Sequence, residues 1–196
     1  MKVHHVLRTA RPRAVIIPAV LALTVALTPP VAERYGDRLQ IALPILALGC
    51  SAITGEAAEF AVRYGVMFLG AHATKRSLGD APMNVRPHGG LQGMPSAHTS
   101  TAVLGASALV SDCLKGSPVA QGAVLLAAGF TGASRIESRS HTIWQVLAGA
   151  IWGWVCDRAL RRPSPARRAV ASFLLRVRRA IGWAVSRGVA VLSGRR

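Results

Sequence analysis

Two short polar segments hold most of the side chains that could do chemistry in this chain of 196 residues. The first covers residues 86–98, just before an alanine-rich stretch, and the second covers residues 134–141. Their reactive or cationic side chains include Arg86, Ser96, His98, Arg135 and His141. Arginine binds phosphate oxygens in a bidentate manner, and histidine acts as nucleophile or proton donor. The two segments therefore predict a phosphate site if the fold brings them together.

The hydrolysis of a phosphate ester requires each of these kinds of group. The uncatalysed reaction is among the slowest known, so catalysis needs cations aimed at the oxygens, a nucleophile, and an acid for the leaving oxygen. We interpret Arg86 and Arg135 as the cations. Ser96 and the amides at the start of the following helix form an anion seat. His98 and His141 supply the acid and the nucleophile.

The composition indicates a membrane protein. Hydrophobic residues make up 51% of the chain and charged residues 16%, and the mean hydropathy is +0.36, more apolar than an ordinary soluble domain. The net charge is +16, but 11 of the 24 Lys and Arg residues lie from Arg158 onward and 4 precede the first apolar run. Basic residues beside apolar segments mark the cytoplasmic side and attract anionic lipids at about 1 kcal/mol each. This distribution favours membrane lipids as partners and argues against nucleic acid.

Apolar runs predict an all-α, multi-pass membrane bundle, because a spanning helix needs about 20 mainly apolar residues. The six predicted spans cover residues 14–32, 39–53, 57–74, 96–110, 119–133 and 142–156. The first run is alternatively a signal peptide, since residues 31–33 resemble a cleavage site. Its length and the pair Pro29-Pro30 favour a retained span.

The predicted topology places both polar segments on one side of the membrane. Basic residues before the first span and after the last place both termini in the cytoplasm by the positive-inside rule. Counting crossings from there, the loops at residues 75–95 and 134–141 emerge on the same outer, periplasmic face. Because the spans were drawn without reference to these loops, their coincidence supports one shared site.

The three cysteines show no spacing typical of a disulfide framework or a metal site. In the predicted topology Cys50, Cys113 and Cys156 all lie toward the cytoplasmic ends of their helices. Thiols stay reduced in that compartment. We therefore expect three small, buried, unpaired side chains.

The chain divides into three predicted parts. Residues 1–56 hold a basic tail and two spans, residues 57–158 hold the site, and residues 159–196 form a basic tail. Within that tail, residues 166–192 predict an amphipathic helix, whose arginines are too costly at the bilayer centre and suit the membrane interface. A helix packed against a partner is the alternative.

Helical spacing connects the two histidines to close helix packing. The residues at i+4 spacing on the sixth span are His141, Gln145, Gly149 and Gly153, and those on one face of the fourth are His98, Ala102 and Gly105. The pattern Gly149-x-x-x-Gly153 allows another helix to approach closely. We therefore expect the histidines at the outer ends of two packed helices.

These residues resemble the type 2 phosphatidic acid phosphatase superfamily, whose motifs are K-x6-R-P, P-S-G-H and S-R-x5-H-x3-D. The corresponding elements here are Arg86-Pro87, Pro95-Ser96-Ala97-His98, Ser134-Arg135 and His141, and the resemblance covers about residues 57–158. It implies metal-independent hydrolysis of a phosphate ester, with no cofactor. It also implies that His141 forms a phosphohistidine and His98 protonates the leaving group. The residues it assigns to the phosphoryl oxygens are Lys75, Arg86, Ser96, Ala97 and Arg135.

Three positions depart from the family pattern. Lys75 lies further from Arg86 than the motif lysine, which would fall at Gly79, so Lys75 or its neighbour Arg76 fills that role. Ala97 replaces the glycine of the second motif.

Gln145 stands where the family usually has aspartate. It can orient His141 by accepting a hydrogen bond, but a neutral amide does not stabilise an imidazolium as a carboxylate does. Some branches that look like dolichyl or polyprenyl diphosphatases also read H-T-x-x-Q.

The resemblance therefore implies a membrane lipid phosphatase, with a polyprenyl diphosphate such as undecaprenyl diphosphate as the favoured substrate. Glycerophospholipid phosphate and lipid A phosphate follow. Two alternatives stay open. One is a lipid phosphotransferase, in which another lipid captures the phosphohistidine. The other, prompted by Gln145, is a membrane protein that binds phospholipid without turnover.

Overall fold

The computed structural model describes residues 12–28 and 31–161, together with isolated residues between 165 and 183. The chain divides into two units, Met1–Arg158 and Ala159–Arg196. The predicted amphipathic helix at residues 166–192 lies largely outside the described residues. The fold and the site below belong to the first unit.

All regular elements in the described residues are helical, which confirms the all-α class. In chain order they are α2 (Pro12–Ala26), α3 (Ala32–Ile53), α4 (Ala57–Ser77), the 3₁₀ helix η1 (Pro82–Asn84), α5 (Ala97–Ala108), the π-helix η2 (Leu109–Cys113), α6 (Pro118–Glu137) and α7 (Ile143–Ala159). Each predicted span corresponds to one of the six α-helices, with α5 and η2 together forming the fourth.

The helix bounds depart from the predictions on the side of the polar segments. The sequence predicts a mixed-charge turn at residues 33–38, but these residues form the first turns of α3. Glu33 and Asp37, one helical turn apart, approach Arg135 of α6 at 3.7 and 3.0 Å, and this pairing stabilises the charged start of the helix. Likewise α6 continues to Glu137, so Arg135 lies on a helix rather than in a loop.

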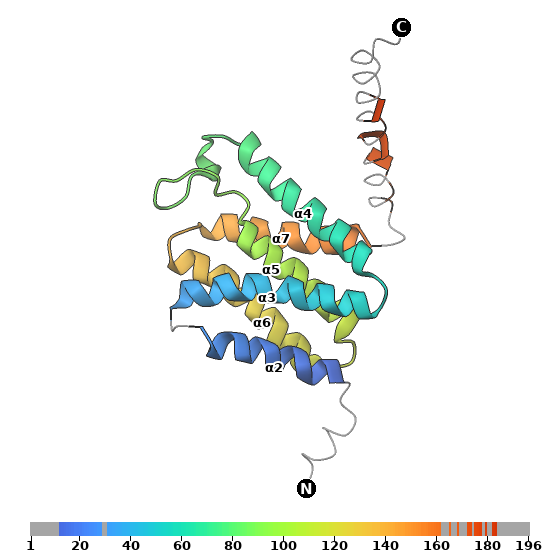
Figure 1. Cartoon of the computed structure of the whole chain (residues 1–196). Helices are drawn as coiled ribbons and strands as arrows, with labels where there is room; N and C mark the ends of the chain where they lie inside the picture. The colour runs from blue at the N-terminus through green and yellow to red at the C-terminus, as the bar shows by residue number, and fades with distance from the viewer. Residues whose placement is uncertain are drawn as a thin grey trace, which may run out of the picture. The chain divides into compact units, whose positions relative to one another are not determined.

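Helix α3 is the centre of the first unit and packs against α2, α4, α5 and α6 (Figure 1). Its buried side chains Leu39, Leu43 and Ala47 recur every four residues and therefore form one face. Small residues allow close contacts around it. A Cβ on Gly105 of α5 would lie 2.7 Å from the backbone of Leu43.

Helix α7 approaches the start of α5 equally closely, as the Gly149-x-x-x-Gly153 pattern predicts. A Cβ on Gly149 would collide with the backbone of Ser96, and one on Gly153 with that of Ser100. Gly105 takes no part in this contact, because its own close neighbour is α3. The predicted close contact between α7 and α5 is therefore confirmed. The prediction that Gly105 lies on the face of α5 in this contact was wrong.

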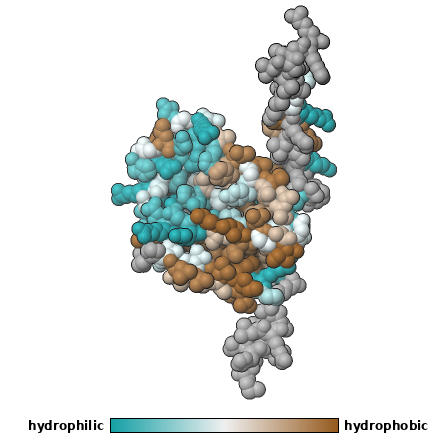
Figure 2. Space-filling model, in the orientation of Figure 1, coloured by the Kyte–Doolittle hydropathy of each residue, from teal (hydrophilic) through white to brown (hydrophobic). Residues whose placement is uncertain are grey.

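The chain places its polar loops at one end of the bundle. In Figure 1 the end of α4, the loop at residues 78–96 and the starts of α5 and α7 lie together at the left. Figure 2 shows hydrophilic side chains gathered over this end and hydrophobic ones along the helices. By length and composition, two described helices could cross a membrane, Ala32–Ile53 and Pro118–Glu137. Six spans therefore remain a prediction.

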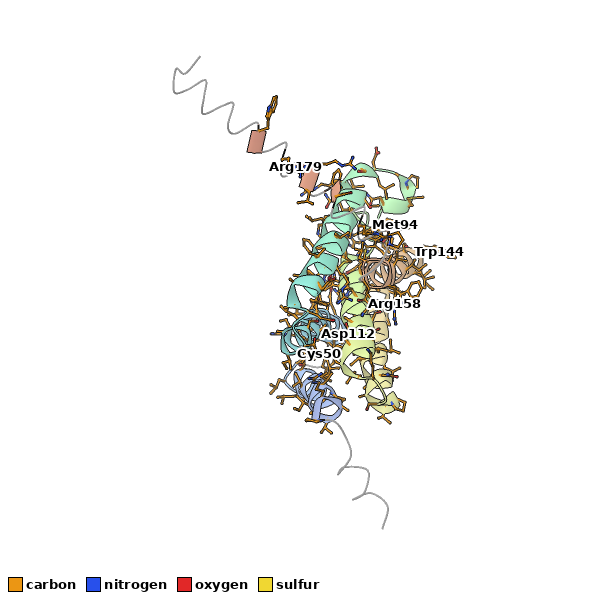
Figure 3. All side chains as sticks on the ribbon, turned by 90° about the vertical axis from the view of Figure 1, so that its right-hand side faces the viewer. Cys50, Met94, Asp112, Trp144, Arg158 and Arg179 are labelled. Carbon is orange, nitrogen blue, oxygen red and sulfur yellow. A yellow bond between two sulfur atoms is a disulfide. The ribbon has the colours of Figure 1, made fainter. Side chains whose placement is uncertain are left out.

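The opposite end holds a disulfide bond that the sequence analysis did not predict. Cys50 at the end of α3 and Cys113 at the end of η2 are bonded across 63 residues of sequence, and Figure 3 views the unit from this end. The prediction of three unpaired cysteines was wrong, because α3 packs against η2 and no local spacing reveals that contact. Cys156 is a free, buried thiol as expected.

Candidate active site

His141 lies between α6 and α7, and both neighbouring segments fix it. Its backbone N–H donates to Arg135 O at 3.0 Å, and the residue is only 3% exposed. Its Nδ1 lies 3.2 Å from Gln145 Oε1. Because an amide oxygen only accepts, Nδ1 carries the proton in this contact, and Nε2 keeps the lone pair. The contact with Gln145 therefore leaves Nε2 as the ring nitrogen with a free lone pair.

Gln145 joins His141 to the loop at residues 78–96. Its Oε1 also accepts from Thr142 N at 3.1 Å, while its Nε2 donates to Met83 O at 3.0 Å and Val85 O at 2.8 Å. An aspartate, the usual family residue, could not donate to these carbonyls. The amide therefore performs a second task, anchoring the loop, that a carboxylate cannot.

Lys75 and Arg86 meet at one backbone carbonyl of that loop. Lys75 Nζ donates to Gln92 O at 2.6 Å, and Arg86 Nη2 donates to the same oxygen at 3.3 Å. Gln92 has φ of 63°, an uncommon conformation for a residue other than glycine. Lys75 is buried and Arg76 is exposed. The structure thus brings Lys75, rather than Arg76, to Arg86.

Asn84 organises the loop from its centre and is fully buried. Its Nδ2 donates to Lys75 O at 2.9 Å and to Gly79 O at 2.6 Å. Its Oδ1 accepts from Met94 N at 3.0 Å, next to a cis Met94–Pro95 peptide bond. One side chain thereby ties the end of α4 to the segment that leads into α5. Sequence reasoning missed this residue, since asparagine in a polar loop carries no distinctive signal.

Arg135 is buried between α6 and the start of α3. Its Nε donates to Ser134 Oγ at 3.3 Å, its Nη2 donates to Glu33 O at 2.6 Å, and its Nη1 lies 3.0 Å from Asp37 Oδ1. A guanidinium has five donors. Nη1 also lies 3.7 Å from Glu33 Oε1, so two carboxylates from the start of α3 hold the guanidinium in place.

His98 lies in the first turn of α5, with 36% of its side chain exposed. Its Nε2 is 3.4 Å from Asp37 Oδ1, the same oxygen that contacts Arg135. Sequence reasoning did not select Asp37. The one available signal was its place four residues after Glu33, which gains meaning only once α3 is docked against α6.

The second-motif residues before His98 form the start of α5. Ser96 is fully buried, and its Oγ accepts from Thr99 Oγ1 at 3.1 Å and caps the helix at Thr99 N. Ala97 is the first residue of α5. Because it has helical backbone, alanine in place of the family glycine causes no strain.

The electrostatics favour a neutral His141 beside a cluster of cations. Burial, followed by the charges of Lys75 and Arg86, lowers the pKa of His141 to about 4. The hydrogen bond with Gln145 opposes this shift, while His98 adds to it. Burial, followed by the charge of Arg86, lowers the pKa of Lys75 to about 8. At neutral pH, His141 is therefore unprotonated and Lys75 is mostly charged.

The fold thus gathers the predicted residues at one end of the bundle, as the mutual electrostatic effects among Lys75, Arg86, Arg135 and the two histidines show. The described segments contain no group of three or more His, Cys, Asp or Glu residues that could hold a metal ion. Two histidines beside Lys75, Arg86 and Arg135 are the kinds of group that suit an anionic phosphate ligand.

The comparisons with known proteins identify the family. A family model described as the PAP2 superfamily matches residues 67–169, more than half of the chain. The protein therefore belongs to the PAP2 superfamily, whose members are generally phosphatases and usually membrane proteins. Searches of curated proteins and of solved structures found no match.

Proposed function

We propose that the protein is an integral membrane lipid phosphatase that hydrolyses a phosphate or diphosphate ester, with polyprenyl diphosphate as the favoured substrate. The observation that carries the proposal is the meeting of two histidines with Lys75, Arg86 and Arg135 at one end of an otherwise apolar bundle. Membership of the PAP2 superfamily supports the reaction class.

The proposed reaction proceeds through a phosphohistidine. His141 Nε2 forms a bond to phosphorus while the bond between phosphorus and the leaving oxygen breaks. The leaving oxygen keeps the electron pair of that bond and accepts a proton from His98. Water then attacks the phosphohistidine, His98 accepts a proton from it, and inorganic phosphate departs. Lys75, Arg86 and Arg135 stabilise the charge on the phosphoryl oxygens throughout.

An apolar groove beside His98 supports a lipid substrate. It has a volume of about 630 Å³ and lies between α3, α4 and α5. His98 and Ala97 line it at the site, and Leu48 and Phe60 line it further along the bundle. Along α4, successive rings from Phe60 through Tyr64 and Phe68 to His72 stand 6.2, 6.2 and 4.2 Å apart. A phosphate held at His98 would place an attached hydrocarbon chain in this groove.

The sides of the helices support a position within a bilayer. Large hydrophobic side chains are exposed on them, including Leu69, Leu126 and Ile151, as lipid contact requires. We propose six spans, cytoplasmic termini, a site on the outer face, and a basic C-terminal tail that binds anionic lipids. The disulfide end then faces the cytoplasm, where burial of Cys50 and Cys113 limits access by reducing thiols. A cysteine at Gly90 should react with a membrane-impermeant reagent in intact cells; reaction only after lysis would refute the orientation.

The activity is tested by measuring phosphate release from polyprenyl diphosphate by the purified protein in the presence of a chelator. Release with chelator present is expected. Binding of the lipid without release from any lipid phosphate tried would favour the non-catalytic alternative, which Gln145 prompts. Transfer of the phosphate to an added lipid acceptor in place of water would instead identify a phosphotransferase.

A further inference from the structure

The two histidines of the site have different polar partners. His141 faces the neutral amide of Gln145 at 3.2 Å, whereas His98 faces the carboxylate of Asp37 at 3.4 Å. In the family motif the carboxylate belongs beside the nucleophile, where this chain has Gln145. Asp37 lies outside residues 67–169, the part of the chain that matches the family. In this chain the carboxylate therefore contacts His98 instead of His141, and it comes from α3.

A proton donor at this position needs a negative partner. Lys75, Arg86 and Arg135 lie at the same end of the bundle, and each would repel a positive charge on His98, whereas the carboxylate of Asp37 would attract it. His141, across the site, is neutral and adds no counter-charge. Among the groups that act on His98 from the helices and loops around it, Asp37 is the anion that stabilises its protonated form.

The packing of α3 holds Asp37 in this place. Next to it, a Cβ on Gly36 would collide with Ser134 of α6 and come within 3.0 Å of Arg135 Nη2. Glu33 O, one turn earlier, accepts from the same guanidinium at 2.6 Å. The start of α3 is therefore fitted against α6, and Asp37 Oδ1 lies between His98 and Arg135.

We propose that Asp37 is the positioning residue for the proton donor of this enzyme: it holds the Nε2–H of His98 and stabilises the charged ring. The proton on Nδ1 then passes to the leaving oxygen as its bond to phosphorus breaks, and His98 is left neutral with its remaining proton on Nε2 toward Asp37. This inference rests on the proposed phosphatase function.

The test compares two substrates that share a hydrocarbon chain and differ in leaving group. A polyprenyl monophosphate must release an alkoxide, a strongly basic leaving group that needs a proton as it departs. The corresponding diphosphate releases a lipid phosphate, which is a much weaker base. Loss of proton donation therefore slows the monophosphate more. A positioned acid contributes about 10²–10⁴-fold, and we expect Asp37→Asn to lower kcat/KM on the monophosphate by about 10- to 100-fold, with a clearly smaller effect on the diphosphate. We compare kcat/KM because it reports the step in which the leaving oxygen departs, whereas the later hydrolysis of the phosphohistidine is the same for both lipids.

The variants are assayed as full-length protein with chelator present. Asp37→Glu keeps the charge and should recover part of the lost rate. Asp80→Asn, the same change at an exposed loop carboxylate near the site, should leave both rates unchanged. If the wild type turns over only one of the lipids, the difference between Asp37→Glu and Asp37→Asn on that lipid decides the matter.

Three results would overturn the inference while leaving the phosphatase function intact. Equal losses on both lipids would indicate a structural role, and unchanged rates would mean that His98 does not depend on Asp37. A lower KM with unchanged kcat would show that Asp37 only competes with the substrate phosphate for the cations of the site. Failure of the wild-type protein to release phosphate from either lipid would instead reject the proposed function, and this inference with it.

Discussion

The two ends of the helical bundle both contain arginine paired with aspartate, yet the surroundings of the pairs differ. At the site end, Arg135 contacts Asp37 at 3.0 Å, and 45% of that aspartate side chain is exposed. At the other end, Arg63 contacts Asp157 at 2.6 Å, and Asp157 is fully buried. Ser107 Oγ also donates to Asp157 at 2.6 Å.

The balance of charge separates the two ends further. Arg63 also lies 3.6 Å from Asp112, and Arg158 lies 3.9 Å from Asp157, so each of these cations has a carboxylate partner. The site end gathers Lys75, Arg86 and Arg135 against two half-exposed carboxylates, Asp37 and Glu33. At the far end, the buried pair of Arg63 and Asp157 binds the helices to one another. At the site end, surplus positive charge beside half-exposed carboxylates is suited to an anionic ligand.

The largest effect should come from removing the proposed nucleophile at the site end. We expect His141→Ala to lower kcat by about 10⁴- to 10⁶-fold, because the covalent route is lost entirely. The protein should still fold, since Gln145 retains its bonds to Met83 and Val85. Phosphate release and circular dichroism measure the two quantities. Full activity in this variant would exclude His141 as the nucleophile.

At the opposite end, Arg63→Met should lower stability rather than activity. It removes the guanidinium between Asp112 and the fully buried Asp157, and breaking a buried ion pair costs about 3–5 kcal/mol. We expect this loss in the free energy of unfolding, measured by denaturant titration in detergent. Turnover per folded molecule should remain near that of wild type.

A second substitution controls for the charge that Arg63→Met leaves behind. Because Asp157 accepts from Ser107 as well, Asp157→Asn in the Arg63→Met background keeps a polar side chain but removes one buried negative charge. Part of the lost stability should return. If stability is not recovered, or if turnover falls as it does at the site end, the two clusters do not differ in the way proposed.

The matched change at the site end, Arg135→Met, should have the reverse outcome. We expect kcat/KM to fall by about 10²–10³-fold, since a cation that stabilises developing charge is lost. Stability should change less than in Arg63→Met, because Asp37 and Glu33 are half-exposed and water can solvate them. The same two assays apply. A larger loss of stability than of activity would reverse the comparison.

The sequence was sufficient to predict the helices and the close approach of two of them, and the reasons are local. Apolar run length determines a helix, so each predicted span has its counterpart in the structure. Gly149-x-x-x-Gly153 predicted the approach of α7 to α5, because a pair of small residues at i+4 spacing can be recognised in the sequence of one helix without knowledge of its partner.

The features that sequence reasoning missed all depend on contacts between distant segments. Asp37 gains its partners only when α3 lies against α6, and Cys50 bonds to Cys113 only because α3 reaches η2. Asn84 joins backbone groups on both sides of its loop. These contacts join segments that are distant in the sequence, so no periodicity or spacing within one segment predicts them.

The smallest effect is expected from Gln145→Glu, which tests how the neutral partner of His141 sets the protonation of that ring. Gln145→Glu preserves the length of the side chain but places a carboxylate beside His141 Nδ1. A negative charge stabilises the imidazolium, so the pKa of His141 should rise from about 4. Because the neutral ring is the proposed nucleophile, the acidic limb of the kcat/KM profile should move to higher pH, by roughly one unit, or about 1.4 kcal/mol.

The same substitution also removes the two hydrogen bonds that Gln145 Nε2 donates to Met83 O and Val85 O. KM should therefore rise as the loop bearing Arg86 loses its anchor. Gln121→Glu is the control at the other end of the bundle, where Gln121 Nε2 donates to Leu114 O at 3.0 Å, and it should leave the pH profile unchanged. An acidic limb that stays in place in Gln145→Glu would mean that the amide does not set the protonation of the nucleophile, and that its task is to hold the loop alone.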